Sequence, residues 1–118
     1  MRRLRVTDTA ALDIAHILMT SRREFGRAAQ TRYRALFEQA RNDLRENPER
    51  VGVVPLEGST LHLYHLRHSK RRLPHASRVA APRHILAFKF NDRFVEIVRV
   101  LHDAMDLESQ LEPNTDQT

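Results

Sequence analysis

The stretch HILAFKFNDRFVEIVRVLH, residues 84–102, decides the fold. Both of its halves are rich in β-branched, aromatic and other apolar residues, as strands are. Between the halves stands Asn91-Asp92, and both residue types tolerate the positive φ of a two-residue hairpin turn. The sequence therefore predicts two adjacent antiparallel strands, 85–90 and 94–101.

The turn also sets an expected register for this hairpin. With Phe90 opposite Arg93, the side of the sheet that receives the core carries three further pairs, which are Phe88 with Val95, Leu86 with Ile97 and His84 with Arg99. The opposite side is half apolar, because it carries Ile85, Phe94, Val98 and Val100, and His102 continues it. An exposed apolar face of this kind indicates a partner.

Toward the N-terminus, the sequence predicts a short strand and two helices. Leu4 and Val6 alternate with arginines, and the segment 7–9 offers N-cap side chains. Gly26 is the kind of residue that ends a helix. The apolar face expected for the first helix is Ala10, Ile14, Ile17, Leu18 and Phe25. The second helix has the stripe Ala29, Tyr33, Leu36, Phe37, Ala40 and Leu44, with Asp43 among its polar positions, and it ends at Asn47-Pro48.

Pro48 to Thr60 is predicted to be an irregular connection, and Leu61 to Leu66 a further strand. We therefore expect an α+β fold in which an N-terminal strand precedes a helical hairpin. This hairpin packs on a small, mainly antiparallel sheet of three to four strands. Residues 1–111 form the single domain, and residues 112–118 are expected to be a disordered acidic tail.

Charge is unevenly distributed along the 118 residues. The chain has twenty Lys and Arg against fifteen Asp and Glu, a net +5, but five of the acids and none of the bases follow His102. A basic body favours an acidic partner such as nucleic acid or an anionic protein surface. Between Glu57 and Asp92 there is no acid at all. The basic residues of that segment favour a phosphate-contacting surface, and the alternative is a solvated loop from Ser69 to Pro82.

Several classes of site are not expected. The chain has no cysteine, which excludes disulfides and thiolate metal sites, and no apolar run long enough to span a membrane, so we expect a cytoplasmic protein. His62, His65 and His68 resemble a metal cluster, but alternation along a strand puts His65 on the opposite face from the other two. No metal or cofactor is therefore expected.

A metal-free ribonuclease needs a base, an acid and cations around one phosphate. Arg67, Lys89, Arg99, His84 and His102 could supply them. The competing interpretation is structural, with His84 and Arg99 as a pair across the hairpin and His102 capping the last strand.

Several short motifs, in this order, resemble one family. They are Asp13-Ile14-Ala15, Phe25-Gly26 followed by Ala28-Ala29 and Tyr33, Asn47-Pro48, Pro82-Arg83-His84-Ile85-Leu86, and Val95-Glu96-Ile97-Val98-Arg99-Val100-Leu101-His102 with Met105-Asp106. Together they are similar to the ParE branch of the ParE/RelE toxin superfamily, over residues 4–111. The segment 69–81 is longer than in many members of that family.

The resemblance implies a plasmid-stabilisation toxin of a type II toxin–antitoxin system, bound by a cognate antitoxin, that arrests growth by binding DNA gyrase. The RelE branch shares the fold but cleaves ribosome-bound mRNA, so a ribosome-dependent mRNA endonuclease is the alternative. A nucleic-acid-binding module without catalysis is a third possibility.

Each function assigns different residues. For the gyrase inhibitor no catalytic residue is expected; the antitoxin covers Ile85, Phe94, Val98 and Val100, and the target contacts His102, Met105 and Asp106. For the ribonuclease the catalytic set is Arg67, Lys89, Arg99 and His102.

Overall fold

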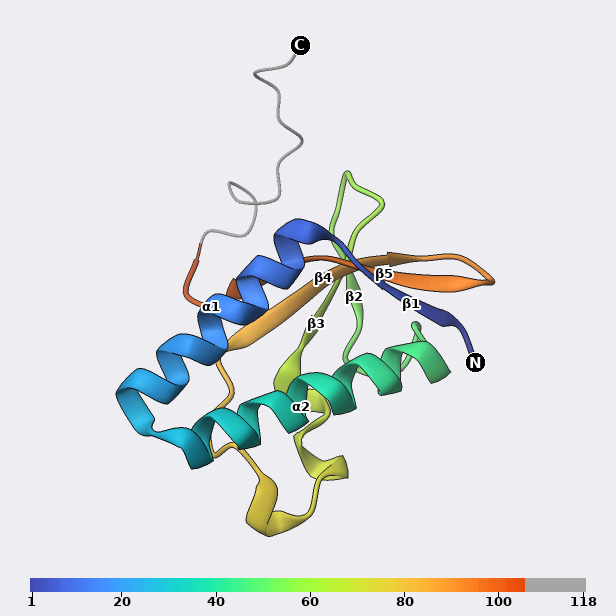
Figure 1. The fold of residues 1–118 in the computed structure, drawn as a ribbon. Coiled ribbons are helices and arrows are strands. Elements are labelled where there is room, and N and C mark those ends of the chain that lie inside the picture. The colour runs from blue at the N-terminus through green and yellow to red at the C-terminus, as the bar shows by residue number, and fades with distance from the viewer. Residues whose placement is uncertain (106–118) are drawn as a thin grey trace, which may run out of the picture.

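A computed structural model describes residues 1–105 of the chain (Figure 1). The elements are β1 (Arg3–Val6), α1 (Asp8–Phe25), α2 (Arg27–Glu46), β2 (Val54–Pro55), β3 (His62–His65), β4 (His84–Phe90) and β5 (Phe94–His102). The strands form one sheet of order β1-β5-β4-β3-β2, in which β1 is parallel to β5 and the other neighbours are antiparallel. The α+β fold is confirmed; the sheet has five strands because the two-residue β2 adds an edge.

The helix boundaries follow the expected signals. Thr7 caps α1, since its Oγ1 accepts from the Ala10 N–H at 3.1 Å and donates to the Val98 carbonyl of β5 at 2.8 Å. Gly26 has φ +94°, a value that L side chains rarely adopt, and it separates the two helices. Asn47 is the C-cap of α2. Neither helix in the described residues is long and apolar enough to cross a membrane.

Both helices lie on the same side of the sheet, and the main core lies between the two layers (Figure 1). The stripe predicted on α2 supplies much of this core, with Leu36, Phe37, Ala40 and Leu44 fully buried. The prediction for Phe25 was wrong, because its side chain is 74% exposed. It is the last residue of α1, immediately before the chain turns at Gly26.

The hairpin has a different register from the expected one. Phe90 is opposite Val95 and Phe88 is opposite Ile97, so the turn lies one residue later than Asn91-Asp92. The Asn91 side chain shapes this turn, since its Oδ1 accepts from the backbone N–H groups of Arg93 and Phe94. The core side of this part of the sheet is nevertheless as predicted, because a shift of two residues keeps every side chain on its face.

A β-bulge at Val98 then reverses the faces of the rest of β5. Ala87 is opposite Arg99 while Phe88 is opposite Ile97, so Val98 is an extra residue on β5. Val100 is consequently 4% exposed and packs in the main core, which corrects its expected place on the outer face. His84 is opposite His102 rather than Arg99, and His102 lies on the helix side.

The outer face of the sheet is partly covered. Ala87 and Leu101 are buried there in a second, smaller apolar cluster. The residues packed against them are Leu56, Leu61 and Leu63, from β3 and the connection before it. The connection before β3, which was expected to be irregular, therefore covers part of the outer face that the sequence predicted to be exposed.

The connection from β3 to β4 is also more ordered than a solvated loop. It contains three 3₁₀ turns, Leu66–His68, Lys70–Arg72 and His75–Ser77. Ser69, between the first two turns, is fully buried.

Candidate functional site

A pocket of about 710 Å³ opens between the helical hairpin and the ends of β4 and β5. Aliphatic side chains of α1 and of the segment 79–81 form part of its wall. The exposed ring of Phe25 also lines it, so this residue belongs to the pocket and not to the core. The polar lining residues that matter for its chemistry are His16, Arg32, Tyr33, Arg83, His84 and His102.

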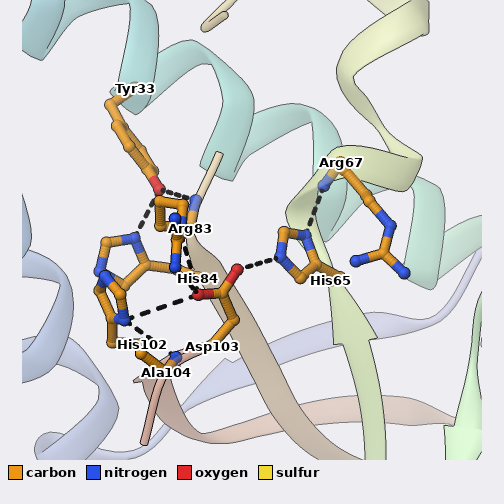
Figure 2. A network of polar contacts seen from close by, with 8 residues as sticks. All are labelled: Tyr33, His65, Arg67, Arg83, His84, His102, Asp103 and Ala104. Carbon is orange, nitrogen blue, oxygen red and sulfur yellow. Dashed lines mark hydrogen bonds and ion pairs between the residues drawn. The ribbon is translucent and has the colours of Figure 1, made fainter. Parts of the chain in front are cut away.

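Tyr33 and His84 form the buried polar contact of this pocket (Figure 2). The Tyr33 hydroxyl accepts from the Arg83 backbone N–H at 3.2 Å and lies 2.5 Å from the His84 Nδ1. Burial, and secondly the neighbouring His102, lower the pKa of His84 to about 4. Burial also raises the pKa of Tyr33. Both groups are therefore neutral at pH 7, and the arrangement that suits them has the phenol donating to His84.

His102 lies beside His84, with the two rings nearly perpendicular and their centroids 5.3 Å apart. Its Nδ1 accepts from the Ala104 N–H at 3.0 Å, which leaves the proton of the neutral ring on Nε2. Nδ1 is 3.6 Å from the Asp103 carboxylate, too far for a hydrogen bond. The half-buried ring of His102 is thus held through Nδ1 by the backbone just after β5, and Nε2 takes no part in that hydrogen bond.

Asp103 ties together the ends of three strands (Figure 2). One carboxylate oxygen accepts from His65 Nε2 and the other from the Arg83 guanidinium, each at 2.9 Å. The Nδ1 of His65 accepts from the Arg67 N–H, so Nε2 is the nitrogen that donates. The His65 hydrogen bond, and after it Arg83, lower the pKa of Asp103.

Arg99 is held at the free edge of β5. β1 pairs with β5 only as far as Ile97, so the backbone beyond the bulge has no strand neighbour on that side. The carboxylate of Asp13 on α1 takes this edge, accepting from the Val100 N–H and from Arg99 Nε, both at 2.9 Å. Arg99 therefore helps to fix α1 against the strand.

The four residues named for a ribonuclease do not converge. Only His102 lies at the pocket. Lys89 is on the outer face near the hairpin turn, 3.5 Å from Glu96, and Arg99 is bound to Asp13. Figure 2 shows the Arg67 side chain extending away from the pair His84 and His102.

The residues named for antitoxin binding have different environments. Ile85, Phe94 and Val98 are partly exposed, while Val100 is in the core, as described above. The Arg5 guanidinium lies 3.8 Å from the centroid of the Phe94 ring, a cation–π contact. Of the residues named for target binding, His102 is half-buried and Met105 is 47% exposed. Asp106 lies outside the described residues.

His62, His65 and His68 have different environments. His65 lies on the opposite face of β3 from His62, as alternation predicted. His62 packs between the rings of Phe88 and Phe90, with centroids 5.7 and 5.0 Å away. His65 binds Asp103, and His68 lies in the turn after β3, with its ring 5.6 Å from that of Tyr64. Within residues 1–105, no group of three or more His, Asp or Glu side chains is placed to hold a metal ion.

Asp43, which was not among the residues predicted for a site, anchors the connection between β3 and β4. Asp43 is 1% exposed and accepts from Ser69 Oγ at 2.6 Å. It also pairs with Arg50 at 3.0 Å and with Arg72 at 2.8 Å. The signal was present in the sequence, because Asp43 stands three residues after Ala40 and seven after Leu36, on the buried stripe of α2.

A family model that describes the ParE toxin of type II toxin–antitoxin systems, parDE, matches residues 4–107. This chain belongs to the ParE toxin family. It is therefore the toxin component of a type II toxin–antitoxin system, and its partner is a cognate antitoxin. No curated protein matches the sequence significantly.

Solved structures agree with this ParE-family toxin in fold. The chain is similar to one from the chromosomal ParDE system of P. aeruginosa, with a TM-score of 0.63 and 15% identity, covering 86% of this chain and 96% of that one. It is also similar to a chain of the E. coli DinJ–YafQ toxin–antitoxin complex, with a TM-score of 0.55 and 15% identity, covering 95% and 98%.

Proposed function

We propose that this ParE-family toxin inhibits DNA gyrase by binding it, without cleaving nucleic acid. The observation that carries the proposal is the family match over residues 4–107, in the branch whose implied target is gyrase. The placement of the candidate ribonuclease residues adds support from the geometry.

Cleavage of a phosphodiester requires a base, an acid and cations within hydrogen-bond reach of one phosphate. Lys89 and Arg99 already hold Glu96 and Asp13, on different parts of the molecule. The Arg67 guanidinium points away from the histidines at the pocket. A binding inhibitor has no such requirement, since its contacts can be spread over a surface.

For the antitoxin we propose the outer face of the sheet around Ile85, Phe94 and Val98. The three side chains are partly exposed and lie outside both apolar clusters of the protein. Arg5 beside Phe94 would add charge at the rim of this face. An apolar centre with a charged rim is the usual anatomy of a protein interface. For the target we propose the segment His102, Met105 and Asp106.

One observation favours the ribosome-dependent endonuclease as the second candidate. Among the residues that line the pocket are Tyr33 of α2, His84 of β4 with Arg83 just before it, and His102 of β5. His102 keeps one ring nitrogen outside the strand-end hydrogen bonds. An imidazole next to a cation is a reasonable acid or base for a bound phosphate. On this proposal the catalytic set would centre on His102, and Arg83 would have to leave Asp103 to reach the phosphate.

The test is a gyrase assay with the purified chain. Supercoiled plasmid, gyrase and ATP are incubated with the toxin, and the DNA is analysed after denaturing the protein. We expect linear DNA to accumulate, and preincubation with the cognate antitoxin to abolish it. In cells, pulse labelling after induction should show DNA synthesis failing before protein synthesis. Early loss of protein synthesis with an intact chromosome, and a plasmid unchanged in vitro, would contradict gyrase as the target and favour the endonuclease.

A further inference from the structure

The chain between Glu57 and Asp92 carries no acid, and its centre folds into the three 3₁₀ turns between β3 and β4. Two of its basic side chains hold the backbone of the turns. Lys70 Nζ donates to the Ala80 carbonyl, and the Arg78 guanidinium donates to the carbonyls of Leu73 and Arg71. Hydrogen bonds to carbonyls fix these side chains but leave their charges in place.

Other arginines of the same region are neutralised by acids. Arg72 pairs with Asp43 at 2.8 Å, and Arg83 pairs with Asp103 at 2.9 Å. Within residues 1–105, no carboxylate pairs with Arg67, Lys70, Arg71 or Arg78. These four residues, which we call the basic loop surface, form the uncompensated charge of the segment.

We propose that the basic loop surface binds the phosphate backbone of duplex nucleic acid. Phosphates are the natural partners of arginine forks, and each contact releases counterions. Segment 67–83 has no Phe, Tyr or Trp, so it offers no platform for the stacked bases of a single strand. Apart from His75, its exposed residues other than Lys and Arg are small, namely Pro74, Ala76, Ala80 and Ala81, which lets a backbone approach closely.

An acidic protein is the rival partner, and the apolar residues of the loop argue against it. Leu73 and Val79, the large apolar side chains between Ser69 and Pro82, are packed against the main core. The loop surface therefore lacks the exposed aromatic or aliphatic anchors on which protein interfaces depend. Charge without apolar anchors fits a regular polyanion.

The experiment measures binding of the purified full chain to a fluorescently labelled duplex DNA of arbitrary sequence, at several salt concentrations. The test variant is Arg67→Gln/Arg71→Gln, which removes two charges and leaves the backbone groups that bond His65 and Arg78. The matched control is Arg22→Gln/Arg23→Gln, the same charge loss at the exposed end of α1. Equal urea midpoints establish that all three proteins are folded.

We expect the test variant to reduce the slope of log affinity against log salt by about 2 and to weaken binding roughly tenfold or more, with a much smaller effect in the control. Duplex RNA is measured alongside: tighter binding to either helix identifies the source of the phosphates. Three results would overturn the proposal: equal losses in both variants, tighter binding to single strands than to duplex, or displacement by polyglutamate as effective as displacement by unlabelled duplex at equal charge. The measurement involves no gyrase, so it stands or fails separately from the proposed target.

Discussion

The ring of His84 lies against Tyr33 and His102, and its burial lowers its pKa to about 4 from an ordinary value of 6.5. Between these two values the unfolded chain binds a proton at His84 that the folded chain does not bind. On unfolding near pH 5, His84 therefore takes up about one proton from the solvent, and the free energy of unfolding falls as the pH is lowered. The contribution of the neutral His84 ring to the free energy of unfolding is complete above about pH 6.5 and is lost toward pH 4.

Urea unfolding between pH 4.5 and 7.5 checks this prediction, with His84→Phe as the variant. We expect the stability of the variant to depend less on pH over this range than that of the natural chain. His68, whose pKa burial also lowers, stays in both proteins and contributes equally. Asp103 acts in a separate window, because its lowered pKa makes stability fall only below about pH 4. Identical pH profiles would mean that His84 titrates normally in the fold.

Asp43 is the second residue on which the fold depends. Removing its carboxylate leaves Arg50, Arg72 and Ser69 without their shared acceptor. We expect Asp43→Ala to lower the free energy of unfolding by about 3 kcal/mol, because it removes the buried, charged acceptor of several hydrogen bonds. It should also speed amide exchange at Arg72, whose N–H bonds the Ser69 carbonyl.

Glu46→Ala is the matched control for Asp43. The Glu46 carboxylate is 3.7 Å from Arg72 but is mostly exposed, so its loss should lower the free energy of unfolding by less than about 1 kcal/mol. Urea unfolding of the two variants makes the comparison. Similar losses in both would show that Asp43 acts as a surface charge.

Local sequence signals predicted those helices and strands that depend on neighbouring residues alone. The 3.6-residue stripe of α2 and its stop at Asn47-Pro48 require no knowledge of the rest of the chain. The bulge at Val98 does depend on the rest of the chain. β1 pairs with β5 only as far as Ile97, and Asp13 of α1 accepts a hydrogen bond from the next part of that edge. In 94–101 apolar residues occur at odd and even positions, so alternation alone could not reveal the change of face.

The pocket could not be predicted from the sequence for a similar reason. Tyr33 and His84 meet although 51 residues separate them, and His84 meets His102 only because the bulge changes the register. His102 was named from the sequence, but for other reasons and on the wrong face. Asp43 could have been found, since an acid on an apolar helical stripe requires a partner.

The bulge also separates two neighbouring valines into different roles. Val98→Asp changes a partly exposed side chain outside both apolar clusters, so we expect antitoxin binding to weaken tenfold or more with little loss of stability. Val100→Asp puts a charge in the main core and should unfold the protein. Calorimetric titration with the antitoxin and urea unfolding measure both effects. A stable Val98→Asp protein with full antitoxin affinity would remove this face from the interface.

Binding and catalysis predict opposite sensitivities to mutation at the end of β5. The deletion to test begins at Met105, since Asp103 and Ala104 hold His65, Arg83 and the His102 ring. For a gyrase inhibitor, the deletion should abolish killing, while His102→Ala should cost at most a few kcal/mol of binding and leave much of the toxicity at high expression.

For an endonuclease, His102→Ala should lower the rate by roughly 10²–10⁴, as loss of a general acid or base does. A killing assay over a range of expression levels separates the two, with antitoxin binding measured in parallel to establish that each variant is folded. A His102→Ala protein that binds antitoxin and never kills would contradict the binding mechanism. Full killing by the deletion would place the target contact elsewhere on the molecule, because the segment from Met105 onward would then be dispensable.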